Sequence, residues 1–391
     1  MKIKITTLIV SLSCSLPVSA YYLGDAKTAR VAGTGVATGH FVNAPINPAL
    51  LSVFDKHTDQ MYITLGIGAT GENYRDSIDT VDDIQDSIDN FDRAINNLDQ
   101  STALSEKESI ISGLSSLDEE TPTGSLGARI GIYAPSHTFA MGFSVINASY
   151  VGLNFHYTES DEAILNEALA TTEFNEDDLT SNLDIRGIAI TELALHFATQ
   201  FYTQHWRVRY GVSPKYIDLQ SYAYNLNVNN ADTDDWFNDQ YRSSAAGVDL
   251  DIGMSADYKK NYKFGLVARN ISGIEIEDAF GDKHTTQTTY TAAIGYQTEQ
   301  ATLAMDIDLE KDPSFNAFLL EKQWARFGLN YAFYSWLEVG TGVRLDLQDN
   351  YQTLYTIGFN ISPYNTVTLD TVLMAGEKDA LGAAIQLGVQ W

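Results

Sequence analysis

The sequence predicts an all-β protein, a transmembrane antiparallel outer-membrane β-barrel of about fourteen strands with an N-terminal plug and partly helical, acidic extracellular loops. Three observations predict this class. The last twelve residues alternate strictly between two kinds of side chain. The first twenty residues have the pattern of an export signal. Short and long connections alternate along the expected series of strands.

The C-terminal stretch has the pattern of a barrel's closing strand. Residues 380–391 read ALGAAIQLGVQW, so apolar residues fall on one face and small or polar residues on the other. In an outer-membrane barrel the apolar face contacts lipid and the other face lines the lumen. Trp391 is expected in the aromatic girdle at the periplasmic end.

The N-terminus indicates export. Residues 1–20 combine two lysines, a short apolar run and a Val-Ser-Ala cleavage pattern before Tyr21, as in a secretory signal peptide. The only cysteine, Cys14, lies in this segment, so the mature chain has none for disulfides or thiolate metal sites. The rest of the chain lacks the long apolar runs of an inner-membrane helix bundle. The expected location is therefore the bacterial outer membrane.

Acidic residues dominate the charge and lie mainly in two segments. The formal net charge is −27, which excludes a nucleic-acid partner because phosphate contact needs clustered Lys and Arg. Residues 72–122 hold 14 acidic and three basic residues, and residues 153–185 hold nine acidic and no basic residues. These segments are expected to be solvated loops. Diffuse binding of divalent cations to them is the alternative.

Runs of period two predict the strands and the orientation of the barrel. In residues 300–310, Leu303 and Met305 lie on the face opposite Asp306 and Asp308. The longest connections, 69–122, 151–185 and 220–245, are all odd-numbered, and bacterial barrels have short periplasmic turns and long outer loops. The expected strands are 59–68, 123–134, 138–150, 186–202, 205–219, 246–258, 261–272, 287–297, 300–310, 318–333, 336–347, 351–361, 365–374 and 380–391.

The predicted domains are a signal peptide (1–20), an N-terminal hatch or plug (21–58) and the barrel (59–391). The segment 21–58 is rich in glycine and turn residues and too apolar for a free periplasmic tail. Within the first outer loop, apolar residues from Ile78 to Leu98 recur at helical spacing opposite a face rich in Asp. A second helix is expected at 160–170, and it is the obvious partner for the first.

Charged residues are also predicted inside the barrel. Acidic residues on two strands have oxygen ligands of the kind that Ca²⁺ prefers: Asp306, Asp308 and Glu310 on one, and Asp249, Asp251 and Asp257 on the other. The alternative, which we favour, is that they pair with basic residues in the lumen. The basic residues expected there are Arg207, Arg209, Lys263, Arg269, Arg326 and Arg344.

No enzymatic site is indicated. The histidines have no metal-ligand spacing, and no nucleophile motif occurs, so we expect no enzyme, no catalytic residues and no specific metal site. Residues 66–71 match Gly-x-Gly-x-x-Gly, but the strand–helix–strand context of a dinucleotide site is missing, so no cofactor is expected.

Two family resemblances refine this expectation. Residues 29–54, ARVAGTGVATGHFVNAPINPALLSVF, resemble the N-terminal motif of the FadL/OMPP1/TodX-type hydrophobic-compound transporters, in which an Asn-Pro-Ala turn follows small residues and glycines. That resemblance implies a fourteen-stranded barrel with a hatch in the lumen. It nominates Asn47 and Pro48 as ligand-path residues, with Gly33 and Gly35 providing flexibility.

The remainder of the chain resembles the outer-membrane family labelled conjugal transfer protein TraF. The matching pieces include residues 211–230, 247–258, 264–271, 305–311 and 337–347. The name is shared with a thioredoxin-like protein, whose chemistry does not apply to a chain without a Cys-x-x-Cys motif. The resemblances imply passive uptake of small hydrophobic compounds, with outer-membrane lipid and a small hydrophobic ligand as partners. The alternative is a non-transporting envelope or conjugal-transfer-associated surface component.

Overall fold

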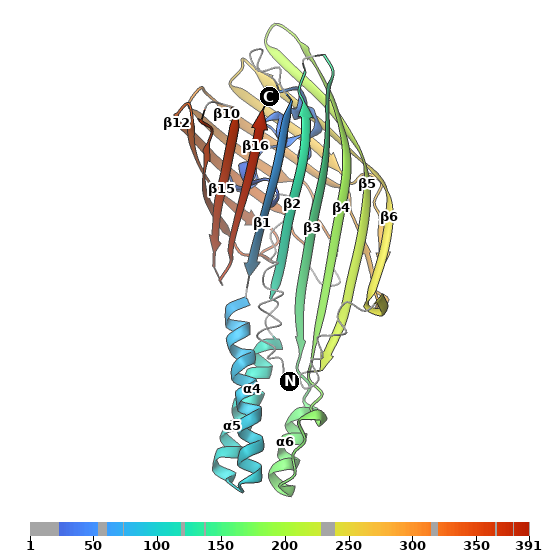
Figure 1. Cartoon of the computed structure of the whole chain (residues 1–391), viewed down its shortest axis with the longest axis vertical. Helices are drawn as coiled ribbons and strands as arrows, with labels where there is room; N and C mark the ends of the chain where they lie inside the picture. The colour runs from blue at the N-terminus through green and yellow to red at the C-terminus, as the bar shows by residue number, and fades with distance from the viewer. Residues whose placement is uncertain are drawn as a thin grey trace.

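The protein is a closed antiparallel barrel of fourteen strands (Figure 1). The computed structural model describes residues 23–53, 61–72, 74–118, 122–136, 138–227, 239–313, 320–363, 366–377 and 379–390. The signal peptide and Trp391 lie outside these residues. The barrel strands are β1 (Tyr62–Glu72), β2 (Thr123–Ala134), β3 (Ala140–His156), β4 (Asn182–Tyr202), β5 (Trp206–Asn227), β6 (Arg242–Tyr258), β7 (Tyr262–Arg269), β10 (Thr289–Gln297), β11 (Ala301–Asp308), β12 (Trp324–Tyr334), β13 (Leu337–Asp346), β14 (Leu354–Ile361), β15 (Val367–Gly376) and β16 (Leu381–Gln390).

The C-terminal strand closes the barrel, as the sequence predicts. β16 pairs with β1 on one side and with β15 on the other. Ile385 and Leu387 are exposed on the outside, whereas Ala384 and Gln386 are buried inside. The same alternation places Leu303 of β11 outside and Asp306 inside. Period-two patterns therefore identified which face of each strand meets lipid.

The two ends of the barrel differ, as the alternation of loop lengths predicts. The connections after β2, β4, β6, β10, β12 and β14 are tight turns at one end, which we call the turn end. The long connections and the helices lie at the other end, the helical end (Figure 1). Aromatic contacts mark the turn end: the rings of Trp206 and Tyr258 are tilted with centroids 4.8 Å apart, and those of Tyr262 and Tyr296 meet edge to face at 5.3 Å. This arrangement is typical of an interfacial girdle.

Four neighbouring strands are longer than predicted. β3, β4, β5 and β6 have 17, 21, 22 and 17 residues, although a tilted strand needs about 10 to cross the membrane. The predicted loops 151–185 and 220–245 are thus partly strand, because the pairing continues to Asn182 opposite Asn227. Their extra residues form a wall that extends past the ends of the other strands at the helical end (Figure 1).

The outer loops carry three helices that pack together. α4 (Tyr74–Asn96) and α6 (Ser160–Thr171) confirm the predicted helices, and their apolar faces share one cluster containing Phe91 and Leu165. Between them, α5 (Gln100–Asp118) contributes Ile110 and was not predicted, because its apolar residues do not form a continuous stripe. Within the described residues, no helix is sufficiently long and apolar to cross a membrane.

Residues 23–53, which we call the inner segment, lie inside the barrel (Figure 1). They contain α3 (Ala26–Ala29) and the short 3-10 helices η1 (Phe41–Asn43) and η2 (Pro48–Ser52). Remaining short elements are η3 (Glu176–Asp178), η5 (Asp239–Tyr241) and the hairpin strands β8 (Glu275–Glu277) and β9 (Lys283–Thr285). The position of the inner segment agrees with the predicted plug, whose full range of 21–58 extends past the described residues and stays a prediction.

Candidate functional site

The inner segment begins with a buried carboxylate, Asp25, that connects it to strand β2. Asp25 precedes α3 and caps it by accepting a hydrogen bond from the Thr28 amide. Its other oxygen accepts from Asn43 Nδ2 at 2.6 Å and from Arg129 Nη1 of β2 at 2.8 Å. Because Asp25 and Arg129 are both almost fully buried, each needs the other as a partner. Removal of either would leave an uncompensated charge.

A second set of ion pairs ties the segment to β13 and β15. Arg30 lies 2.6 Å from Asp370 of β15 and 2.6 Å from Glu338 of β13. Asn360 and Asn330 donate hydrogen bonds to these two carboxylates. The Arg30 side chain is 3% exposed, so this double contact replaces the water that a guanidinium would otherwise bind.

The middle of the inner segment is held by its backbone. The amides of Gly35 and Val36 both donate to Oδ2 of Asp306 on β11, each at 2.9 Å. Asp306 is fully buried. The strand therefore presents one carboxyl group to two consecutive N–H groups, the arrangement that anion-binding turns use.

The four residues nominated from the family resemblance all lie in the inner segment, and a hydrogen bond brings Asn47 close to Gly35. Asn47 caps η2, and its Nδ2 donates to the carbonyl of Val36, the residue after Gly35, and to the carbonyl of Met254. Pro48 packs against the backbone of Gly211. Gly33 has a φ of +82°, which only glycine adopts easily. None of the four lines the two lumen cavities described below, so their role in binding stays a prediction.

Sequence reasoning missed the glycines that receive the inner segment. A side chain at any of ten inward-facing strand glycines would collide with residues 23–53. The sequence shows glycines at lumen-facing positions of the strands. Their purpose becomes clear only when the inner segment is known to lie against them. They are Gly66, Gly68, Gly211, Gly253, Gly265, Gly295, Gly328, Gly340, Gly342 and Gly358.

The inner segment lies between two polar cavities. The one at the turn end has a volume of about 240 Å³ and is lined by Lys27, Arg30 and Glu338, among others. The one at the helical end has about 100 Å³ and is lined by Glu310 and Lys322, among others. Along β11 the first cavity reaches Ala304 and the second begins at Asp308, and Asp306 between them binds the inner segment.

Ion pairs between neighbouring strands line the lumen, in agreement with the pairing predicted from the mixed charges. Arg326 makes two hydrogen bonds of 2.9 Å to Asp308. Arg209 and Lys263 both contact Asp257. The described residues contain no group of three acidic, His or Cys side chains placed to hold a metal ion. Diffuse cation binding at the acidic loops stays a prediction.

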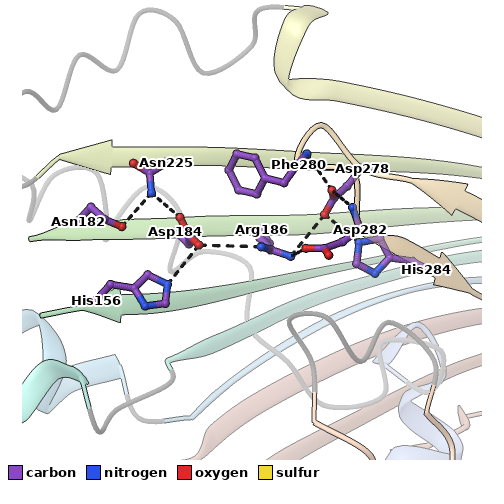
Figure 2. A network of polar contacts seen from close by, with 9 residues as sticks. All are labelled: His156, Asn182, Asp184, Arg186, Asn225, Asp278, Phe280, Asp282 and His284. Carbon is purple, nitrogen blue, oxygen red and sulfur yellow. Dashed lines mark hydrogen bonds and ion pairs between the residues drawn. The ribbon is translucent and has the colours of Figure 1, made fainter. Parts of the chain in front are cut away.

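A polar network closes the helical end above the smaller cavity (Figure 2). The loop that carries β8 and β9 contributes Asp278 and Asp282, and both contact Arg186 of β4, at 3.6 and 2.5 Å. His284 Nε2 forms a hydrogen bond of 3.0 Å with Asp278 Oδ2, the oxygen that also faces Arg186, and Oδ1 accepts from the amides of Phe280 and Asp282. Burial favours the neutral carboxyl group, but hydrogen bonds from His284 and from loop amides prevail and lower the pKa of Asp278.

The base of this loop lines the cavity. Asn270 and Thr286, at either end of the loop, are lining residues. Ile274 and Ile276 bury their side chains against Ile217 and its neighbours on the inner face of the extended wall. The loop is therefore fastened over the helical-end cavity by an apolar contact and by the Arg186 ion pairs.

An apolar groove lies on the outside of the barrel, behind the inner segment. It has a volume of about 790 Å³ and is lined by lipid-facing residues of β7 and β10 to β14, such as Phe264, Met305 and Leu329. Lys263, Ala304 and Gly328 line both this groove and the turn-end cavity. The wall between them is thus one strand thick.

The comparisons with known proteins agree with this architecture. The solved structure of the Pseudomonas putida toluene transporter TodX covers 93% of this chain and 95% of its own, with 10% identity and a TM-score of 0.51. The CymD monoaromatic hydrocarbon channel covers 93% and 95%, with 10% identity and a TM-score of 0.53. At these identities the likeness shows the fold, that of an outer-membrane barrel. A search of curated protein sequences gave no match.

A family model gives the more specific result. The model described as "F plasmid transfer operon, TraF, protein" matches residues 44–308, more than half of the chain. The match extends from the second half of the inner segment to the end of β11. With its closed barrel, its apolar outer face and this match, the chain belongs to the TraF outer-membrane family.

Proposed function

We propose that the protein is a gated outer-membrane channel for the passive uptake of small hydrophobic compounds, in which the inner segment is the gate. The observation that carries the proposal is the division of the lumen: one segment, held by a few polar contacts, separates a cavity at each end of the barrel. The similarity in fold to chains described as hydrocarbon channels supports it.

The route follows from where apolar surface lies. Both lumen cavities have charged linings, so a hydrophobic compound gains little by resting in them. Apolar surface is found instead in the outer groove and on the buried side chains of the inner segment, such as Val36, Phe41 and Ile46. A shift of the inner segment around Asn47 would expose these buried apolar side chains. A ligand could then reach the single layer of strands that separates the lumen from the outer groove.

A second function is favoured by the ion pairs that line the lumen and hold the inner segment in it. Arg30, Arg209 and Arg326 each bind a carboxylate there, and the described lumen holds no continuous apolar channel. Such a filled barrel suits a non-transporting envelope component of conjugal transfer, in keeping with the family description. The two functions differ in whether the inner segment has to move.

A reversible disulfide between the inner segment and the barrel distinguishes the two functions. A Cβ built on Gly328 would lie 2.5 Å from Thr34 Oγ1, where the sulphur of a T34C substitution would sit. The T34C/G328C pair therefore comes close to disulfide geometry with a small shift. The mature chain is expected to contain no other cysteine, so the pair should form without competition.

Uptake of radiolabelled toluene and of a panel of other small aromatic compounds is measured in cells that carry the locked variant. Uptake that falls to the level of cells lacking the protein, and recovers after reduction, supports gating. The single variants T34C and G328C are the controls. Unchanged uptake of every compound after complete oxidation, and in cells lacking the protein, would establish the non-transporting function.

A further inference from the structure

The extended wall at the helical end has one open edge. β6 pairs with β5 along its whole length, from Trp206 opposite Tyr258 to Tyr222 opposite Arg242. On its other side it pairs with β7 only from Ile252 to Tyr258. Among the residues that the structure describes, residues 242–248 of β6, which we call the open edge, therefore have a neighbouring strand on one side only.

The edge is open because the chain turns away from β6 after β7 ends. After β7 ends, Asn270 and Gly273 adopt positive φ angles of +57° and +68° and turn the loop off the wall toward the lumen. Ile274 then packs on the inner face, beneath Gly247. A last hydrogen bond from the Ile271 amide to the Leu250 carbonyl marks where the neighbour departs.

That hydrogen bond also fixes which backbone groups face outward. The Leu250 carbonyl points away from β5, and backbone direction alternates along an antiparallel strand. Ser244, Ala246 and Val248 have the same parity, so their N–H and C=O groups point away from β5. Within the described part of the chain, no hydrogen bond to these six groups is found.

Apart from Arg242 at its end, the open edge has none of the usual protection against pairing among the described residues. Natural edge strands are blunted by Lys, Pro, bulges or a covering element. Residues 243–248 read SSAAGV, with no charge and no proline, and Val248 is 75% exposed. The register with β5 is continuous and shows no bulge. A stretch that lies about ten residues from the turn end is also beyond the membrane, so lipid does not cover it.

We propose that the open edge of β6 is a docking site for an extended segment of another protein, which adds to the wall as a further strand. Backbone hydrogen bonds to Ser244, Ala246 and Val248 would supply the affinity, as in other strand-addition complexes. This inference does not depend on the proposed function, because it needs neither transport nor movement of the inner segment.

A second copy of the chain does not fit this edge. Two copies in one membrane are related by an axis along the membrane normal, which leaves both β6 strands running in the same direction. The two-fold axis sets each outward residue opposite its own copy, so N–H groups would face N–H groups and carbonyls would face carbonyls. The occupant is thus a different polypeptide, at the end of the barrel that carries the long loops.

Charge defines the partner further. Asp239 lies in η5 directly before β6, and the exposed Glu277 belongs to β8, which contacts β6. With a net charge of −27, the protein repels acidic segments. The side chains at 244 and 246 are small. The expected occupant is an extended segment of small or β-branched residues with Lys or Arg at its ends.

Hydrogen exchange of the full-length protein in detergent tests the edge directly. The amides of Ser244, Ala246 and Val248 should exchange fast, and those of Ser243, Ala245 and Gly247, which face β5, slowly. A millimolar octapeptide, Lys-Thr-Val-Thr-Val-Thr-Val-Lys, should slow exchange at the first three amides only. Protection of those amides in the isolated protein would overturn the proposal, as would a peptide without effect on them.

Two substitutions at one position sharpen the test. A246P removes an outward N–H that the ladder with β5 does not use, and proline is tolerated at such edge positions. It should weaken peptide binding at least about tenfold, whereas the matched control A246S should bind as the wild type does. Heat-modifiable mobility on gels verifies that both variants fold. Equal peptide affinity of A246P and A246S would contradict docking at this edge.

Discussion

The contact between Asp306 and the inner segment provides the sharpest test of how the lumen is closed. The substitution D306A removes the acceptor of the Gly35 and Val36 amides, two hydrogen bonds of 2.9 Å in a fully buried place. Each is worth about 1–1.5 kcal/mol net, and a buried amide without an acceptor costs more. The docked inner segment should therefore lose about 3 kcal/mol.

A loss of this size raises the population of the undocked state roughly a hundredfold. Single-channel conductance in planar bilayers measures this population, and D306A should open more often than the wild type. Glu310 provides a matched control, because it lies on the same face of the chain two positions beyond Asp308 and contacts no residue of the inner segment. If D306A and E310A open equally rarely, Asp306 does not hold the gate.

Three further predictions concern the wall and the outer loop. G253V places a side chain against Asn47, so it should destabilise the docked inner segment by about 1–3 kcal/mol, measured as faster proteolysis of residues 23–53. R186M removes the partner of Asp278 and Asp282 and should speed hydrogen exchange in β8 and β9 without changing exchange in β16. Because the pKa of Asp278 is lowered in the folded protein, its contribution to stability is present above the ordinary Asp pKa and is lost only as pH falls through the lower, folded value. The loop should thus stay docked at pH 4, and D278N should abolish this acid resistance.

The outer loops show which elements local sequence patterns can predict and which they cannot. Alternation predicted all fourteen strands, since facing lipid or lumen is a property of each residue and its neighbours in sequence. It placed the ends of β4 to β6 wrongly by four to eight residues, because the wall beyond the membrane follows from pairing with adjacent strands. Helix α5 was missed for a similar reason, as its Ile110 is buried by α4 and α6 together.

The sequence by itself determined the class of the protein, the count and direction of its strands, the sorting of loops by length and the mixed charge of the lumen. These depend on periodicity and composition, which need no knowledge of distant contacts. Only the tertiary structure decided that Asp306 binds the amides of Gly35 and Val36, which are 271 and 270 residues away in sequence. It likewise decided that the strand glycines receive the inner segment and that, within the described part of the chain, residues 242–248 pair with β5 alone. Such facts arise where separate parts of the chain meet, and no local pattern encodes which parts those are.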